Sequence, residues 1–301
     1  MISYVIASLT AVLLWRSLRE TWLRLPPFET AINAVVICFF AIFQRHDETS
    51  LFLRYFQIAL LCAMILLLVR GMMRHRAARL SALASIMAIT LIVVFGVAGN
   101  HLTTGTEAVP NLSSPLRNGT YYVVQGGNNP LLNAHRFSAR ATAQRYAMDF
   151  TKLSGLGRHS ASFLPGQDPS DYLIYNEPVH APCDGSVISM ADGFADLPAG
   201  QTDSQNPAGN YVAIGCDIGV TVVLAHLRTG IGAKLGERVR VGQAVGRVGN
   251  SGNSTEPHLH MHLVSDIVRN ERELLFLGDG IVVTVDGETL YRGRTLVVGS
   301  P

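Results

Sequence analysis

Residues 258–263 read His-Leu-His-Met-His-Leu, a strict alternation of imidazole and apolar side chains. Successive side chains of a β-strand point to opposite faces, whereas a helix would scatter such an alternation around its axis. We therefore expect a strand on which His258, His260 and His262 share one face while the apolar residues pack into a core. Three neighbouring imidazoles on one strand face are typical of a metal site with its acid–base partners.

The chain beyond residue 120 has the same strand character. Short β-branched runs recur there between clusters of glycine, asparagine, aspartate and proline, and no amphipathic helix of ordinary length separates them. This pattern is typical of an all-β domain. We therefore predict a β domain over residues 121–301, with its core in 121–266. A linker over 101–120, rich in Thr, Ser, Asn, Gly and Pro, precedes it.

The first hundred residues have a different composition. They contain nine arginines and four acidic residues and so carry +5, against −3 for residues 101–301. Charged residues make up only 15% of the whole chain, which argues against disorder, a coiled coil and a nucleic-acid-binding arm. Apolar runs without charge predict an α-helical membrane region over 1–100, with about four spans near 1–15, 30–44, 55–69 and 80–99. Three spans and an interfacial first helix are the alternative.

Arginines between these runs predict the orientation. The loop before the last run contains four arginines between residues 70 and 79 and no acidic residue, so we expect it to be cytoplasmic. The β domain would then lie outside the cytoplasm. Cys183 and Cys216, the two cysteines of that domain, could form a disulfide in an oxidising compartment. Two unlinked, buried thiols are the alternative.

Two further residues are candidates for the site. Asp149 stands between two apolar residues on a predicted strand, where a carboxylate is either a metal ligand or a buried group that needs polar partners. His226 ends the alternating run VTVVLAHL and would share a face with Leu224 and Val222. Taken alone, His226 equally fits a buried, hydrogen-bonded histidine. Two imidazoles and one carboxylate suit zinc, because they leave the ion a net charge of about +1 and an open fourth position.

The segment NSGNSTEPHLHMHL, preceded by YVAIG, VTVVLAHL and RVRVGQAVGRVG, resembles the lysostaphin-type (LytM-like) zinc metallopeptidases over about residues 121–266. The resemblance implies antiparallel sheets with a β-hammerhead-like element, one Zn²⁺ per chain, and hydrolysis of peptide bonds in bacterial peptidoglycan. Together with the predicted spans, it implies a multi-pass protein of the bacterial inner membrane with a periplasmic catalytic domain. The expected partners are the lipid bilayer and peptidoglycan stem or cross-link peptides, and no nucleic acid.

The resemblance also implies roles for individual residues. Asp149 and His260 would bind zinc, and His226 and His258 would be catalytic. No H-E-x-x-H sequence is present to provide a glutamate base, so one of these two histidines must act as the base. The sequence leaves open which of the two it is.

The first metal ligand departs from the family pattern. A ligand histidine usually stands four residues before the aspartate, where this chain has Arg145, and a guanidinium has no lone pair to give a metal. We interpret His135 as the displaced ligand, with His159 as its rival. His262 is an additional histidine that we expect to support the ligands from behind.

Two other functions fit parts of the sequence. A catalytically inactive domain of the same fold would bind cell wall or activate another hydrolase. The run GERVRVGQAVGRVG also resembles half of a biotinyl/lipoyl-type carrier module, which needs a modifiable lysine at a hairpin tip. Neither Lys152 nor Lys234 stands at such a turn.

Overall fold

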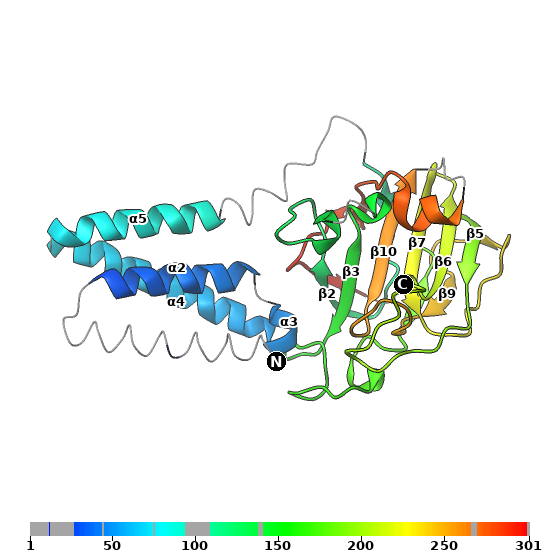
Figure 1. The fold of residues 1–301 in the computed structure, drawn as a ribbon, viewed down its shortest axis with the longest axis horizontal. Helices are drawn as coiled ribbons and strands as arrows, with labels where there is room; N and C mark the ends of the chain where they lie inside the picture. The colour runs from blue at the N-terminus through cyan, green and yellow to red at the C-terminus, as the bar shows by residue number, and fades with distance from the viewer. Residues whose placement is uncertain are drawn as a thin grey trace. The chain divides into compact units, whose positions relative to one another are not determined.

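The computed structural model describes Val12 and residues 27–43, 45–74, 76–93, 109–137, 141–265 and 270–299. The chain divides into two compact units (Figure 1). The first contains residues 1–101 with 156–158, and the second contains residues 102–155 with 159–301.

The first unit is helical. Its helices are α2 (Pro27–Phe43), α3 (His46–Thr49), α4 (Leu51–Arg74) and α5 (Arg76–Val93). Helices α2, α4 and α5 pack against one another around a small apolar core (Figure 1). Ala34, Ile37, Met64 and Ile89 are buried in it.

None of the helices in the described part of the chain is long and apolar enough to cross a membrane. The prediction of about four spans, and of a multi-pass inner-membrane protein, is therefore wrong. A crossing needs about 20 predominantly apolar residues, but α2 has 17. The apolar runs of α4 and α5 share their helices with arginines, at positions 54, 70 and 74 in α4 and at 76 and 79 in α5.

The predicted run at 1–15, apart from Val12, and the end of the run at 80–99 lie outside the described residues. The expected lipid-bilayer partner and the expected periplasmic position of the β domain depend on the predicted spans. Without those spans, neither expectation is supported.

The second unit is built on an antiparallel eight-stranded sheet (Figure 1). In sheet order its strands are β13 (Thr295–Val298), β2 (Gly119–Gln125), β3 (Met148–Leu153), β10 (Leu259–Ser265), β7 (Val220–Leu227), β6 (Asn210–Cys216), β5 (Gly185–Ala191) and β8 (Arg238–Val239). This confirms the all-β class that the turn-rich, β-branched sequence predicts.

Two small sheets and several short helical turns complete the unit. The small sheets are β1 (Asn111–Leu112) with β11 (Thr284–Val285) and β12 (Glu288–Thr289), and β4 (Pro178–His180) with β9 (Ala244–Arg247). The turns are the 3-10 helices η2 (Ala134–Phe137), η3 (Thr142–Gln144) and η4 (Pro169–Asp171) and the π-helical turn η5 (Glu273–Leu277). Strand β1 lies inside the segment that the composition assigns to a linker.

The large sheet buries apolar residues on both faces, because alternate side chains of each strand point to opposite sides. One face contributes Val212, Leu224, Leu259, Met261 and Phe150 to the main core. The other face packs Tyr211, Ala213, Val223, Ala225 and Val264 against Leu274 and Leu275 of η5. The histidines described below lie on this second face, beside η5.

Cys183 and Cys216 form a disulfide in the structure, as the sequence allowed. Cys216 ends β6, and its register partner on β5 is Gly185, two residues beyond Cys183. A Cβ atom at Gly185 would collide with the backbone oxygen of Gly215, so glycine is required where the strands approach. The bridge therefore joins two neighbouring strands at the edge of the main core.

Removing this disulfide should destabilise the β unit. It closes a loop with a sequence separation of 33, for which loop-closure entropy predicts about 3–4 kcal/mol. We expect the free energy of unfolding of the double variant Cys183→Ala, Cys216→Ala to fall by about 2–4 kcal/mol in urea titrations. Cys38→Ala serves as the control. An unchanged unfolding midpoint on reduction would show that the bridge is dispensable.

Candidate metal centre and catalytic groove

Asp149 and His260 are cross-strand neighbours on the second face. Strands β3 and β10 pair so that the two residues lie directly opposite each other, and Asp149 Oδ1 is 2.9 Å from His260 Nδ1. The neighbours of His260, Leu259 and Met261, lie in the main core, as does Met148 beside Asp149. The alternation predicted for both strands is confirmed.

His135 joins this pair from a turn. It lies on the 3-10 helix η2, and its Nε2 is 3.0 Å from Asp149 Oδ2. Its support comes from a turn and not from a strand. The fully buried side chain of Asn133 supports it instead, donating to the carbonyls of Gly127 and Ala147 and accepting from the His135 amide.

His226 reaches the site through a β-bulge. Strict alternation would have placed it with Leu224 and Val222 in the main core. However, the register of β6 and β7 shifts so that Leu227 pairs with Asn210 and Ala225 with the next residue. His226 is left unpaired between them with a φ of 62°, a left-handed conformation that is strained for a side chain of this size.

Three hydrogen bonds hold this bulged residue. The His226 amide donates to Ala208 O at 3.1 Å, and its carbonyl accepts from the Gly249 amide at 3.0 Å. Its Nδ1 lies 2.9 Å from Ser251 O. A carbonyl can only accept, so the ring proton is on Nδ1 and the lone pair is on Nε2.

His258 presents the same tautomer. It immediately precedes β10, and its Nδ1 lies 2.8 Å from Glu256 O and 3.1 Å from Ser254 Oγ. The carbonyl again places the proton on Nδ1. The His258 ring centroid is 4.8 Å from that of His226, so the two imidazoles stand side by side.

His262 continues the histidine stripe behind His260. Its Nδ1 lies 2.9 Å from His260 Nε2, and its Nε2 lies 3.1 Å from the carbonyl of Leu274 in η5. The residue is buried. It therefore occupies the supporting position that the sequence predicts, and the Leu274 carbonyl is a contact that no sequence motif indicated.

Burial and neighbouring charges together raise the pKa of His135 and lower the pKa values of Asp149, His260 and His262. Burial opposes charge on Asp149, yet His135 and His258 hold the pKa of its carboxyl well below the usual range. Burial also opposes charge on His135, but Asp149 raises its pKa above the usual value. Burial lowers the pKa of His260, and lowers that of His262 to about 3. His260 and His262 are therefore neutral at pH 7.

The side chains form two overlapping groups of donor atoms. One ligand atom from each of His135, Asp149 and His260 lies within 4.8 Å of the other two, and the same holds for His226, His258 and His260. A groove of about 380 Å³ opens onto these groups, lined by His135, His226, His260 and His262 together with Ala225, Pro207 and Phe276. His159 belongs to neither group: its ring is buried and stacks on Tyr172 at 5.3 Å.

Comparison with known proteins agrees with this arrangement. Residues 172–273 match the model of Peptidase family M23. This range includes His226, His258 and His260, whereas His135 and Asp149 precede it. This part of the β unit is therefore similar to Peptidase family M23, which agrees with the lysostaphin-type resemblance drawn from the motifs.

Individual relatives are distant. An "Uncharacterized metalloprotease" of Haemophilus influenzae is 30% identical over 170 residues, which cover 54% of this chain and 33% of the relative. A zinc-containing peptidase from Vibrio cholerae is 22% identical over 53% of this chain and 38% of its own, with a TM-score of 0.33. The lysostaphin catalytic domain from Staphylococcus simulans is 20% identical over 42% and 71%, with a TM-score of 0.28. The chain therefore spans about a third of the length of the curated relative.

Proposed function

We propose that this chain is a zinc-dependent endopeptidase that hydrolyses peptide bonds of bacterial peptidoglycan. In this proposal His135, Asp149 and His260 bind the metal, and His226 and His258 carry out the proton chemistry. Residues 121–301 form the catalytic domain. The M23 match supports a metallopeptidase, and the motif resemblance supports the peptidoglycan substrate.

One chain of hydrogen bonds carries the metal assignment. The Leu274 carbonyl can only accept, so neutral His262 has its proton on Nε2 and an acceptor at Nδ1. His260 Nε2 must then donate to that acceptor. A neutral His260 has no second proton, so its Nδ1 lone pair faces the Asp149 carboxylate at 2.9 Å. A metal cation between these two acceptors would remove their repulsion.

The donor set fits zinc. Two neutral imidazoles and one carboxylate are typical protein ligands of a catalytic zinc ion and leave one position open. Ligand atoms about 2.0–2.1 Å from such an ion, at tetrahedral angles, lie about 3.3 Å apart. Asp149 Oδ2 lies 3.0 Å from His135 Nε2, and Asp149 Oδ1 lies 2.9 Å from His260 Nδ1, so each carboxylate oxygen is close to that separation from one imidazole nitrogen. When bound, zinc would supply Lewis acidity to polarise a carbonyl and to activate water.

His258 is the better placed of the two remaining histidines to accept a proton. Its Nε2 lies 3.8 Å from Asp149 Oδ1, so a proton accepted at this atom would face a carboxylate oxygen. Burial, together with His258 and His260, lowers the pKa of His226 well below the usual value. We therefore assign His258 as the general base and His226 as a neutral polar contact for the reacting groups.

An active enzyme is favoured over an inactive wall-binding domain because every part of the machinery is assembled. The three proposed ligands converge, and the strained backbone of His226 is held in place by three hydrogen bonds. Strain of this kind persists where the surrounding structure enforces it, and it clusters at active sites.

The test is digestion of purified peptidoglycan by the full chain. We expect soluble fragments whose masses correspond to cleaved peptide bonds, with release abolished by a chelator and restored by zinc. His258→Ala is the matched control. Binding to the wall without fragment release would support the inactive alternative instead.

His262 should affect zinc affinity without touching the metal. His262→Leu removes the acceptor for His260 Nε2, and loss of such a supporting contact costs about 10–100-fold in metal affinity. His262→Gln should retain more affinity, because its amide can accept from His260 and donate to Leu274. Competition with a chromophoric chelator measures both. Equal zinc affinity in wild type and His262→Leu would contradict this account.

A further inference from the structure

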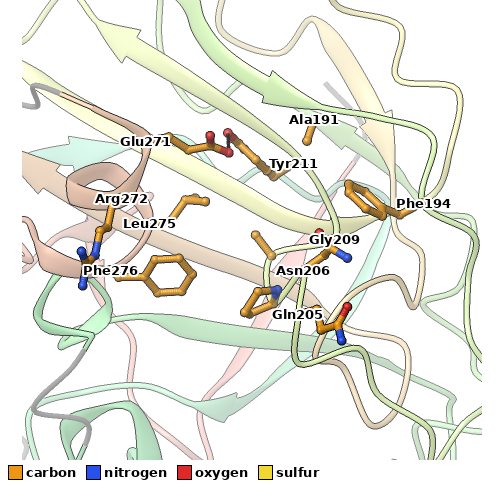
Figure 2. A pocket seen from close by; sticks show the side chains of 12 residues that line it. Ala191, Phe194, Gln205, Asn206, Gly209, Tyr211, Glu271, Arg272, Leu275 and Phe276 are labelled. Carbon is orange, nitrogen blue, oxygen red and sulfur yellow. Dashed lines mark hydrogen bonds between the residues drawn. The ribbon is translucent and has the colours of Figure 1, made fainter.

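A second cavity continues the groove across the sheet. It has a volume of about 290 Å³ and shares Pro207, Ala208, Leu275 and Phe276 with the groove that contains the histidines. Figure 2 shows its side chains arranged around the opening. Because the two cavities share these lining residues, the second cavity lies next to the groove, within reach of a side chain of a peptide that occupies the groove. Its volume is just below the range of drug-sized sites, which suits one side chain.

The polar end of this cavity is a fixed carboxylate. Glu271 is exposed, and its Oε1 accepts a hydrogen bond of 2.8 Å from the Tyr211 hydroxyl. Tyr211 is only 2% exposed, and its hydroxyl also lies 2.8 Å from Ser189 Oγ. Burial, with the nearby Glu271 charge, raises the pKa of Tyr211 to about 12, so the hydroxyl remains a donor. One oxygen of Glu271 is thereby anchored while its side chain faces solvent.

The rest of the lining combines apolar side chains with Gln205, Asn206 and Arg272. Phe194, Leu275 and Phe276 provide the walls. Figure 2 shows Glu271 beside Tyr211, whereas Arg272 lies beside Phe276, on the other side of Leu275. The negative charge is therefore local to one end of the cavity. An occupant that matches this arrangement has an aliphatic stem and a positively charged end.

We propose that this cavity is a specificity subsite for a substrate residue with an aliphatic side chain that ends in an ammonium group. The inference rests on the proposed peptidase function, because it places the cavity beside the scissile bond. Glu271 binds the ammonium group, Tyr211 orients Glu271, and Phe194 and Phe276 contact the stem. Charge-assisted hydrogen bonds of this type are stronger than neutral ones.

Binding of two small probes to the full chain tests the subsite. The probes are Nα-acetyl-lysine amide and Nα-acetyl-norleucine amide, which lacks the ammonium group. Kd values are obtained from chemical-shift changes of labelled Tyr and Phe residues. We expect the wild type to bind the lysine probe about fivefold to tenfold more tightly than the norleucine probe, somewhat less than a hydrogen bond to a charged group typically contributes, because Glu271 is exposed. Glu271→Gln should remove this preference, and Arg272→Gln should keep it.

Three outcomes would overturn the subsite: equal Kd values in the wild type, a preference that survives Glu271→Gln, or no binding of either probe. The titration needs no metal and is run without it, so hydrolysis of the amide bonds in the probes plays no part. Failure here would therefore leave the peptidase proposal intact, and a chain without peptidoglycan hydrolysis could still bind the lysine probe.

Discussion

Replacing His260 with alanine should abolish both zinc binding and peptidoglycan hydrolysis. The substitution removes one of three proposed protein ligands. It also removes the ring that contacts both Asp149 and His262. Its loss of metal affinity should exceed the 10–100-fold that a supporting residue typically contributes. Metal content by mass spectrometry and fragment release from purified wall measure the two effects.

A matched histidine control separates this effect from general damage to the fold. His180 lies on β4, away from the two donor groups, and its Nδ1 is 3.3 Å from Pro115 O. His180→Ala should retain full zinc and full activity. If His260→Ala retained zinc while His258→Ala lost it, the assignment of ligand and base on this strand would be reversed.

His226→Ala and His258→Ala should each lower kcat by about 10²–10⁴ while retaining one zinc per chain. General acid–base groups typically contribute a factor of this size to the rate. The zinc should be retained because neither residue is a proposed metal ligand. Steady-state kinetics on purified wall and metal content by mass spectrometry measure both effects. A loss smaller than about tenfold in His258→Ala, or the loss of its zinc, would contradict these roles.

The sequence predicts the parts of the site that obey simple strand alternation. Leu259, Met261 and Leu263 enter the main core as expected, which places the histidines between them on the opposite face. The same pattern places Asp149 opposite the core. Period-2 alternation is sufficient here because β3 and β10 pair without interruption around these residues.

Other parts of the site depend on irregular backbone that no periodic pattern encodes. His226 faces the groove because a one-residue bulge reverses the alternation of β7. His135 lies on a turn fixed by Asn133, whose three hydrogen bonds connect segments up to fourteen residues apart. The second cavity combines Tyr211 on β6 with Glu271, sixty residues later in the chain.

The membrane prediction failed for a different reason. A run without charged residues describes only the local composition of the chain. A membrane crossing requires one continuous apolar helix of sufficient length. In the described residues such runs end within helices that also contain arginine, as in α4 and α5. Similar runs equally form the apolar contacts of a helical unit, where Ile37, Met64 and Ile89 pack together.

Zinc stoichiometry in two histidine variants tests whether His135, Asp149 and His260 bind the metal. His135 and His159 are the two candidates for the first ligand, and of these two His135 lies beside Asp149 in the structure. We expect one zinc per chain in the wild type and in His159→Ala, and almost none in His135→Ala after dialysis against a weak chelator. Full metal in His135→Ala, with none in His159→Ala, would contradict this assignment.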